Sequence, residues 1–190
     1  MKKDVTTLTI LAFDPGIHHT GWSITKLDRN TNQSVVTMYG TIEAVALAKK
    51  EDNANYKTYG NIIPLFRLEL EVIKLMNTYQ PDYVVCENAF MAKFHNAFVS
   101  LRLCINTIQR AAYGFQKLLY LVAPKEAKKA VSTGSADKVA VQESIQKLPD
   151  LMIKETKQRP LAKMVEHEAD SIAIGYAFTH LVLPDLLLPK

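Results

Sequence analysis

The chain has 190 residues, 48 % of them hydrophobic and 22 % charged, with a net charge of +4 from 23 basic and 19 acidic side chains. These values are ordinary for a globular domain that forms its core without disulfide bonds, and they do not by themselves require a nucleic-acid partner. No stretch approaches the ~20 apolar residues of a membrane helix, and the first apolar run ends at Asp14, too soon for a signal peptide. We therefore expect one domain, residues 1–190, that works in the cytoplasm.

Three strands are predicted before residue 41. Residues 6–13 are rich in Thr, Ile and Leu and lead into Asp14-Pro15-Gly16, a sequence typical of a strand followed by a turn. Residues 21–26 and 34–40 predict two further strands, joined by the polar turn at residues 28–33, so that the three form antiparallel hairpins. No element is assigned to the polar residues 44–59.

From residue 64 onward, predicted helices and strands alternate. Apolar residues have helical spacing over 64–79, 92–115 and 161–183, whereas the short apolar runs 83–86 and 118–122 predict strands. Two shorter helices are expected to begin at Pro124 and Ala136, and residues 149–160 are interpreted as a connector. Strands reached through helices are normally parallel. The order therefore predicts an α/β fold whose five-stranded mixed sheet, three strands antiparallel and then two parallel, has helices on both faces.

The helix predicted over residues 92–115 has apolar residues on two sides. Its main stripe includes Ile105, Ile108 and Ala112, whereas Val99 and Leu103 lie among polar residues on the far side. A second apolar spot on a helix that already packs along one side is typical of a partner surface. Scattered apolar residues on an ordinary surface explain the pattern equally well.

Three acidic residues occupy positions where a carboxylate is costly. Asp14 and Glu87 each follow an apolar strand, and Asp170 shares the expected inner face of the last helix with Ala177 and Leu181. Burying several carboxylates together is unfavourable unless a cation neutralises them. Carboxylate oxygens suit Mg²⁺, and two such ions about 3.5–4 Å apart can stabilise the attacking and leaving oxygens of a phosphodiester. The three acids are therefore candidates for a metal-dependent site.

Each candidate also has an ordinary structural explanation. An Asp before Pro-Gly is commonly a turn residue, and an acid near the start of a helix interacts favourably with the helix dipole. His167 precedes Asp170 by three residues, so both can face one way and the imidazole could bind a metal or orient a water. Glu166, four residues before Asp170, is a rival for that position. The remaining histidines lack such spacing and are interpreted as surface or packing residues: His18, His19, His95 and His180.

Two segments have the chemistry to contact DNA. Between residues 125 and 138 four lysines stand against two acids, a composition suited to phosphates, with a solvated helix surface as the competing interpretation. Phe90 and Met91 lie just after Glu87, where apolar side chains could stack on bases or wedge between them, although they could also anchor a loop. The expected DNA-binding residues are Phe90, Met91, Lys93, Lys125, Lys128, Lys129 and Lys138.

Four blocks of the chain resemble the RuvC family of Holliday-junction resolvases, and they occur in the family's order. They are FDPGIHHTGWSI (13–24), QPDYVVCENAFMAK (80–93), APKEAKKAVSTGSADKVAVQ (123–142) and HEADSIAIGYAF (167–178). The second block is the most specific, because its Gln-Pro-Asp-Tyr start, its strand-end Glu and its Phe-Met-Ala-Lys end all match. Together the blocks span nearly the whole chain.

The resemblance implies an RNase H-like fold and a homodimeric crossover junction endodeoxyribonuclease. Such an enzyme resolves four-way DNA in recombination and repair by paired symmetric nicks. Mg²⁺ or Mn²⁺, two ions per active site, would serve as the cofactor, with no small-molecule cofactor and no membrane. Asp14, Glu87 and Asp170 match the family's metal-binding catalytic acids. His167 matches the fourth position, which favours it over Glu166.

The resemblance also assigns DNA contacts, and the chain departs from the family in three places. Phe90 matches the aromatic residue that stacks on bases at the junction centre, and Lys128 and Lys138 resemble basic residues near the scissile phosphate. The loop before Lys138 is one residue shorter than in the family, the connector at 148–161 is longer, and Asn88-Ala89 differs from the common pair. The lysine correspondence and the preferred cleavage sequence therefore stay open.

Three other classes of protein share part of this pattern. An actin-like or sugar-kinase ATPase shares the Asp-x-Gly start but requires two lobes and a second Gly-rich loop, neither of which the sequence shows. A module that binds branched DNA without cutting has no use for the four site residues. A related RNase H-like nuclease acting on RNA, flaps or three-way branches would use the same residues. The size of the chain suits a bacterial and a bacteriophage enzyme equally.

Overall fold

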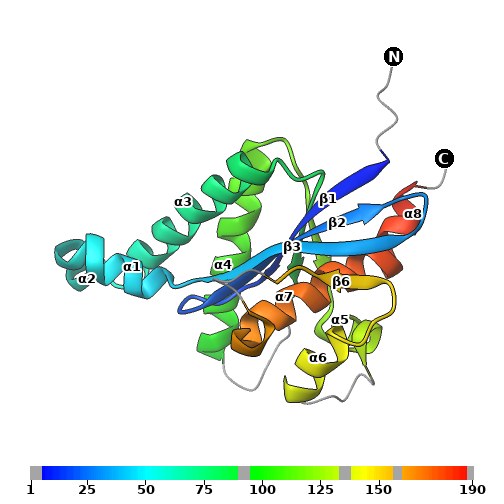
Figure 1. Cartoon of the computed structure of the whole chain (residues 1–190). Helices are drawn as coiled ribbons and strands as arrows, with labels where there is room; N and C mark the ends of the chain where they lie inside the picture. The colour runs from blue at the N-terminus through cyan, green and yellow to red at the C-terminus, as the bar shows by residue number, and fades with distance from the viewer. Residues whose placement is uncertain (1–5, 90–94, 133–137, 156–159, 188–190) are drawn as a thin grey trace.

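The computed structural model describes residues 6–89, 95–132, 138–155 and 160–187, without the side chains of 138–140. Six strands form one mixed sheet in the order β5-β4-β1-β2-β3-β6 (Figure 1). The strands are β1 (Thr7–Asp14), β2 (Thr20–Asp28), β3 (Gln33–Ile42), β4 (Tyr83–Glu87), β5 (Leu119–Val122) and β6 (Leu151–Ile153). β1, β2 and β3 pair antiparallel, whereas β4 and β5 extend the sheet in parallel, as expected.

The α/β class and the helices on both faces of the sheet are confirmed, but the predicted number of strands was wrong by one. β6 pairs in parallel with β3, and Ser34 lies opposite Leu151. These residues were interpreted as part of a connector because three residues are too few for an alternating pattern to be recognised. Pairing with β3, rather than local sequence preference, makes this segment a strand.

The helices follow the predicted order with some changes at their ends. They are α1 (Ala44–Glu51), α2 (Asn53–Tyr59), α3 (Ile62–Tyr79), α4 (His95–Gly114), α5 (Pro124–Val131), α6 (Lys138–Ile145), α7 (Glu166–Ala177) and α8 (Leu183–Leu187). α1 and α2 fill the segment that received no assignment. α1 buries only Ala44, Val45 and Ala48, and α2 buries none of its residues, so their helical pattern is weak in the sequence.

The alternation of side chains along β1 builds two cores. Leu11 and Phe13 face α3 and α4, whereas Ile10 and Ala12 face α5 and α7, and all four are fully buried. Figure 1 shows these helices on opposite sides of the sheet. The carboxyl ends of β1 and β4 therefore lie between two packed layers, where side chains are partly shielded from water.

The last helix is not continuous. A 3₁₀ turn (Leu161–Lys163) precedes α7, and a π-helical turn (Phe178–Val182) separates α7 from α8. The wider turn shifts the helical register, so Leu181 is 49 % exposed although it was expected on the inner face. Among the residues that the structure describes, no helix combines the length and the apolar character that crossing a membrane requires.

Asp150 ties the turn before β6 to this irregular helix. The Tyr176 hydroxyl donates to one carboxylate oxygen at 2.9 Å, and His180 Nε2 lies 2.7 Å from the other. Burial would raise the pKa of Asp150, but the hydrogen bonds from Tyr176 and His180 lower it below its ordinary value of 3.8. A carboxylate with a lowered pKa stabilises the fold above its unfolded-state pKa, and this contribution is lost as the pH falls through the folded-state pKa.

Tyr176→Phe is expected to lower the free energy of unfolding by about 1 kcal/mol at pH 7, because it removes one hydrogen bond to this carboxylate. The loss should shrink as the pH falls below 3.8 and Asp150 becomes protonated. Urea unfolding at pH 7 and at pH 3 measures both effects. Tyr59→Phe, at a tyrosine that is 58 % exposed on α2, is the control and should change nothing. Equal stability of the two variants at pH 7 would mean that the hydrogen bond from Tyr176 to Asp150 does not stabilise the fold.

Candidate active site

Two of the predicted acids lie next to each other at the carboxyl ends of β1 and β4. β1 and β4 are parallel neighbours, and their register places Phe13 opposite Cys86. Asp14 and Glu87 are the next residues along each strand, so the two strands end in carboxylates side by side. Because buried apolar residues directly precede each acid, each backbone holds its acid at the boundary between the core and solvent.

α7 brings the other two predicted residues to the same carboxyl ends of the strands. His167, in its first turn, places Nδ1 2.7 Å from an Asp14 carboxylate oxygen, and Asp170 follows one turn later. Gly21 makes this close approach possible, since it pairs with Asp14 across β1 and β2. A Cβ atom at Gly21 would overlap the backbone carbonyl of His167. The absence of a side chain at Gly21 therefore lets α7 lie directly against β2 beside Asp14.

The site residues are electrostatically coupled. Burial, reinforced by the neighbouring carboxylates of Asp14 and Asp170, raises the pKa of Glu87 to about 7. Burial and the carboxylates of Asp14 and Glu166 likewise raise the pKa of Asp170 to about 6. The Lys128 ammonium partly opposes both shifts. The cluster of acids is thus costly in the form in which all are ionised, as the sequence led us to expect.

The same surroundings favour the charged form of His167, whereas they disfavour the charged forms of Glu87 and Asp170. Its hydrogen bond to Asp14 raises its pKa, although burial alone would lower it. The Asp14 carboxylate is only 13 % exposed, and its contact with this imidazole offsets part of the cost of burying the charge. Within the described part of the chain, no three His, Cys, Asp or Glu side chains are gathered closely enough to hold a metal ion as they stand. Asp14 is instead engaged with His167.

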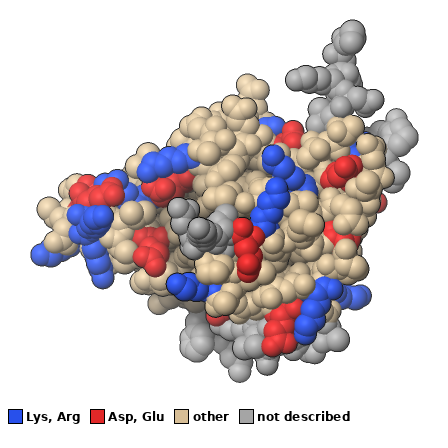
Figure 2. All heavy atoms as spheres, in the orientation of Figure 1, with Lys and Arg blue, Asp and Glu red and all other residues tan. Residues whose placement is uncertain are grey.

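The predicted DNA-binding residues fall into three groups. Lys128, half-buried on α5, is near enough to Glu87 and Asp170 to lower the pKa of each, whereas Lys125 and Lys129 are exposed on the same helix. Figure 2 shows basic and acidic side chains interspersed over one face of the molecule rather than segregated. The remaining predicted residues lie outside the described residues or, for the last, have a side chain outside them: Phe90, Met91, Lys93 and Lys138.

His19 reaches the site although its spacing gave no indication of this. Its ring stacks on that of His167, with centroids 5.7 Å apart and an angle of 22° between the planes. It also lines a pocket of about 540 Å³ beside α7, together with Thr41, Glu43, Val165, Glu166, His167 and Glu168. Glu166, the rival of His167, faces this pocket, whereas His167 holds Asp14. The one signal in the sequence was that His19 lies between Asp14 and Gly21.

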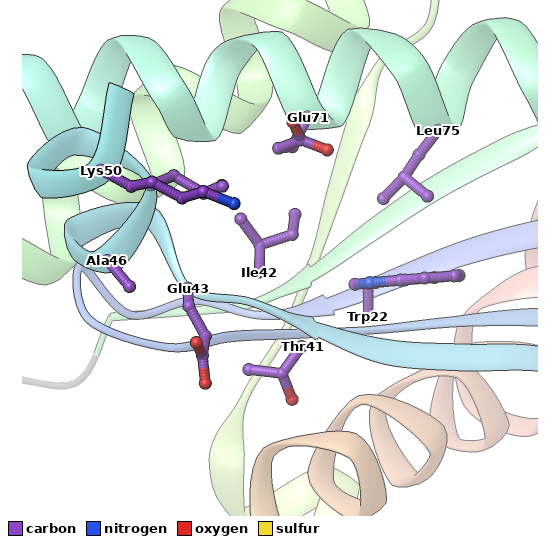
Figure 3. Close-up of a pocket in the computed structure, with 9 residues that line it drawn as sticks. Trp22, Thr41, Ile42, Glu43, Ala46, Lys50, Glu71 and Leu75 are labelled. Atoms are coloured by element: carbon purple, nitrogen blue, oxygen red, sulfur yellow. The ribbon is translucent and has the colours of Figure 1, made fainter. Parts of the chain in front are cut away.

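A second hollow lies on the other face of the sheet and contains none of the four predicted catalytic residues. It has a volume of about 510 Å³ and is bordered by α1, α3 and the ends of β2 and β3. Figure 3 shows Trp22, Ile42 and Leu75 on the side of α3, whereas Thr41 points the other way, toward α7. The sheet therefore separates this hollow from the acids.

Glu87→Gln is expected to stabilise the protein when metal ions are removed with a chelator. Because the folded-state pKa of Glu87 is about 7 and its ordinary value is 4.5, the folded protein retains this proton longer than the unfolded chain. Stability is consequently lost as the pH rises between these values. Glutamine removes the charge, so the unfolding free energy should rise by about 2 kcal/mol at pH 8 and hardly change at pH 4.

Urea unfolding at the two pH values is the measurement, and Glu143→Gln on the exposed surface of α6 is the matched control. A gain at pH 8 that also appears at pH 4, or in the control, would show that burial of the Glu87 charge is not its cause.

The sheet order, the helices on both faces and the strand-end acids define an α/β protein with an RNase H-like fold. A family model described as crossover junction endodeoxyribonuclease RuvC matches residues 10–180. The chain therefore belongs to the RuvC family of crossover junction endodeoxyribonucleases.

Individual relatives cover most of the chain. RuvC from Protochlamydia amoebophila is 29 % identical over 178 residues, which make up 93 % of this chain and 92 % of the relative. RuvC from Caldicellulosiruptor saccharolyticus is 26 % identical over 142 residues, 74 % of this chain and 78 % of the relative. The structure of Thermus thermophilus RuvC superposes with a TM-score of 0.67 at 18 % identity, covering 94 % of this chain and 96 % of that one.

The same Thermus protein has also been solved in complex with Holliday junction substrate. That structure gives a TM-score of 0.67 at 17 % identity and covers 95 % of this chain and 97 % of that one. At these identities the structural likeness establishes the fold, and the RNase H-like expectation is confirmed.

Proposed function

We propose that this chain resolves Holliday junctions by cutting two DNA strands at symmetric positions, with divalent metal ions as cofactor. The observation that carries the proposal is the convergence of Asp14, Glu87, His167 and Asp170 from β1, β4 and α7. Family membership supports the reaction class, and the Thermus relative bound to Holliday junction substrate supports the substrate. Residues 1–190 would act as one nuclease domain in the cytoplasm.

The donor set fits Mg²⁺ or Mn²⁺. Three carboxylates and an imidazole are oxygen and nitrogen ligands of the kind these ions accept, and a bound cation would offset the burial and the neighbouring carboxylates that raise the pKa of Glu87 to about 7 and of Asp170 to about 6. Asp14, Glu87 and Asp170 would hold the ions, two per site, and His167 would complete the set. Bound metal supplies a water of lowered pKa and stabilises the charge that develops on the phosphate.

The chain's own residues would position the DNA strand. The end of β1 fixes the position of the Asp14 carboxylate, which would set the position of the scissile phosphate relative to Glu87. Lys128 approaches the same acids from α5 and would contact a phosphate oxygen. His167 would keep Asp14 oriented through its Nδ1 contact. In-line attack would leave a 5′-phosphate and a 3′-hydroxyl.

Two symmetric cuts require two such sites, so we propose a homodimer. Val99 and Leu103 are 41 % and 42 % exposed on α4, as expected for the far side of that helix. On α3, Phe66 and Leu70 add further exposed apolar surface, with 53 % and 48 % exposure. A contact between copies through this surface would bury side chains that are otherwise costly to leave in water.

Cleavage of a synthetic four-way junction in Mg²⁺ or Mn²⁺ tests the proposal. Each strand is labelled in turn, and the products are sized on a denaturing gel. We expect paired nicks at symmetric positions in two strands of like polarity, and far slower cutting of duplex, flap, three-way and RNA substrates. Binding without cutting would instead identify a junction-binding module, and preferred cutting of another substrate would identify a related nuclease.

A further inference from the structure

The stacking of His19 on His167 extends the site beyond the four predicted residues. The two rings have their centroids 5.7 Å apart at an angle of 22°, a geometry typical of an attractive ring contact. His167 in turn lies 2.7 Å from Asp14, so the three side chains form one continuous row. His19 therefore contacts a residue that touches the central acid.

The loop that carries His19 is held by its own short-range contacts. The Thr20 hydroxyl donates to the Gly16 carbonyl at 2.7 Å, and the Gly16 amide donates back to it at 3.4 Å. A Cβ atom at Gly16 would come within 2.5 Å of the His19 carbonyl, so the loop closes this tightly only with glycine there. The backbone of His19 is thus fixed relative to the ends of β1 and β2.

The ring of His167 needs such support. Its side chain is 37 % exposed, at the first turn of α7 and at the edge of an open pocket. The hydrogen bond to Asp14 holds one ring nitrogen, and a contact on the ring face restricts the remaining rotation about the side-chain torsions. Its backbone is fixed against Gly21, but the direction of the ring depends on what contacts it.

We propose that His19 is a positioning residue that acts through His167, and that its ring, rather than its charge, is what the site uses. The stack holds the His167 imidazole in the orientation that keeps Nδ1 directed at Asp14. This inference rests on the proposed nuclease function. It assigns His19 a role in the rate of the cleavage step and none in the affinity for DNA.

Single-turnover cleavage of the four-way junction tests the role. His19→Ala is expected to lower the cleavage rate constant about fivefold, the order of effect that loss of one ring contact has on a barrier, with half-saturating junction concentration unchanged. His19→Phe retains a flat ring and should restore most of the rate. Tyr59→Ala, which removes an exposed ring on α2, is the matched control and should cut like the unmodified protein.

Proton NMR of the metal-free protein provides a second measurement that does not depend on cleavage. The His167 ring resonances, assigned with His167→Gln, should lose their ring-current shift in His19→Ala and keep it in His19→Phe. Unchanged rate and resonances in His19→Ala, or failure of phenylalanine to restore them, would overturn the inference. If the unmodified protein cuts no junction, the proposed function fails instead, while the NMR comparison still decides whether His19 orients His167.

Discussion

Asp14→Asn is expected to abolish junction cleavage while leaving junction binding nearly unchanged. Asparagine keeps the size and shape of the side chain at the end of β1, so the fold and the DNA surface are preserved. It removes the charge that faces His167 and that would help to hold a metal ion. Because bound metal contributes several kcal/mol to stabilising developing charge, the cleavage rate should fall at least about a thousandfold.

Two assays on the same preparation separate these effects. Single-turnover cleavage in Mg²⁺ gives the rate, and a gel-shift titration with metal chelated gives the affinity. Asp185→Asn, at an exposed aspartate on α8, is the matched control and should behave like the unmodified protein. A variant of Asp14 that cuts normally would remove this residue from the active site. Loss of binding together with cleavage would point to misfolding, which circular dichroism would reveal.

Gly21→Ala is expected to damage both the fold and the site. The added Cβ atom would overlap the carbonyl carbon and oxygen of His167, which are backbone atoms and cannot rotate away. The first turn of α7 must therefore move off β2, at a cost of about 3 kcal/mol in unfolding free energy. The shift would carry His167 and Asp170 away from Asp14. A displacement of this kind can lower a catalytic rate about a hundredfold.

Gly114→Ala distinguishes this local overlap from the general effect of replacing glycine. Gly114 is the last residue of α4, and a Cβ atom there meets nothing within 4 Å. That variant should be as stable as the unmodified protein or slightly more stable, with full cleavage. Urea unfolding and junction cleavage measure both variants. Normal stability and cleavage in Gly21→Ala would show that α7 does not need this close contact with β2.

The main strands could be predicted because each depends on a strong local pattern, whereas the choice of His167 over Glu166 came only from the family resemblance. Apolar runs that stop at Asp14 and Glu87 predict buried strands with acids at their ends, and the register of β1 and β4 then places the two acids together. β6 could not be predicted, because its strand conformation comes from pairing with β3. The break after α7 was also missed, since the π-helical turn leaves no recognisable mark on the apolar spacing.

The contacts between site residues were beyond prediction for a related reason. That His167 would lie against Asp14 depends on the approach of α7 to Gly21, a contact between residues distant in sequence. His19 was set aside because only its spacing was considered, whereas its position is determined by the closed loop from Gly16 to Thr20. In both cases the three-dimensional packing supplies information that periodicity does not contain.

Diffraction from crystals soaked in Mn²⁺ shows whether Asp14, Glu87 and Asp170 form a cation site. We expect an anomalous peak in contact with these carboxylates, and with it a shorter separation between Asp14 and Glu87 than in metal-free crystals. Manganese found only elsewhere, or carboxylates that stay apart with Asp14 still paired to His167 at saturating Mn²⁺, would mean that these acids do not form a cation site.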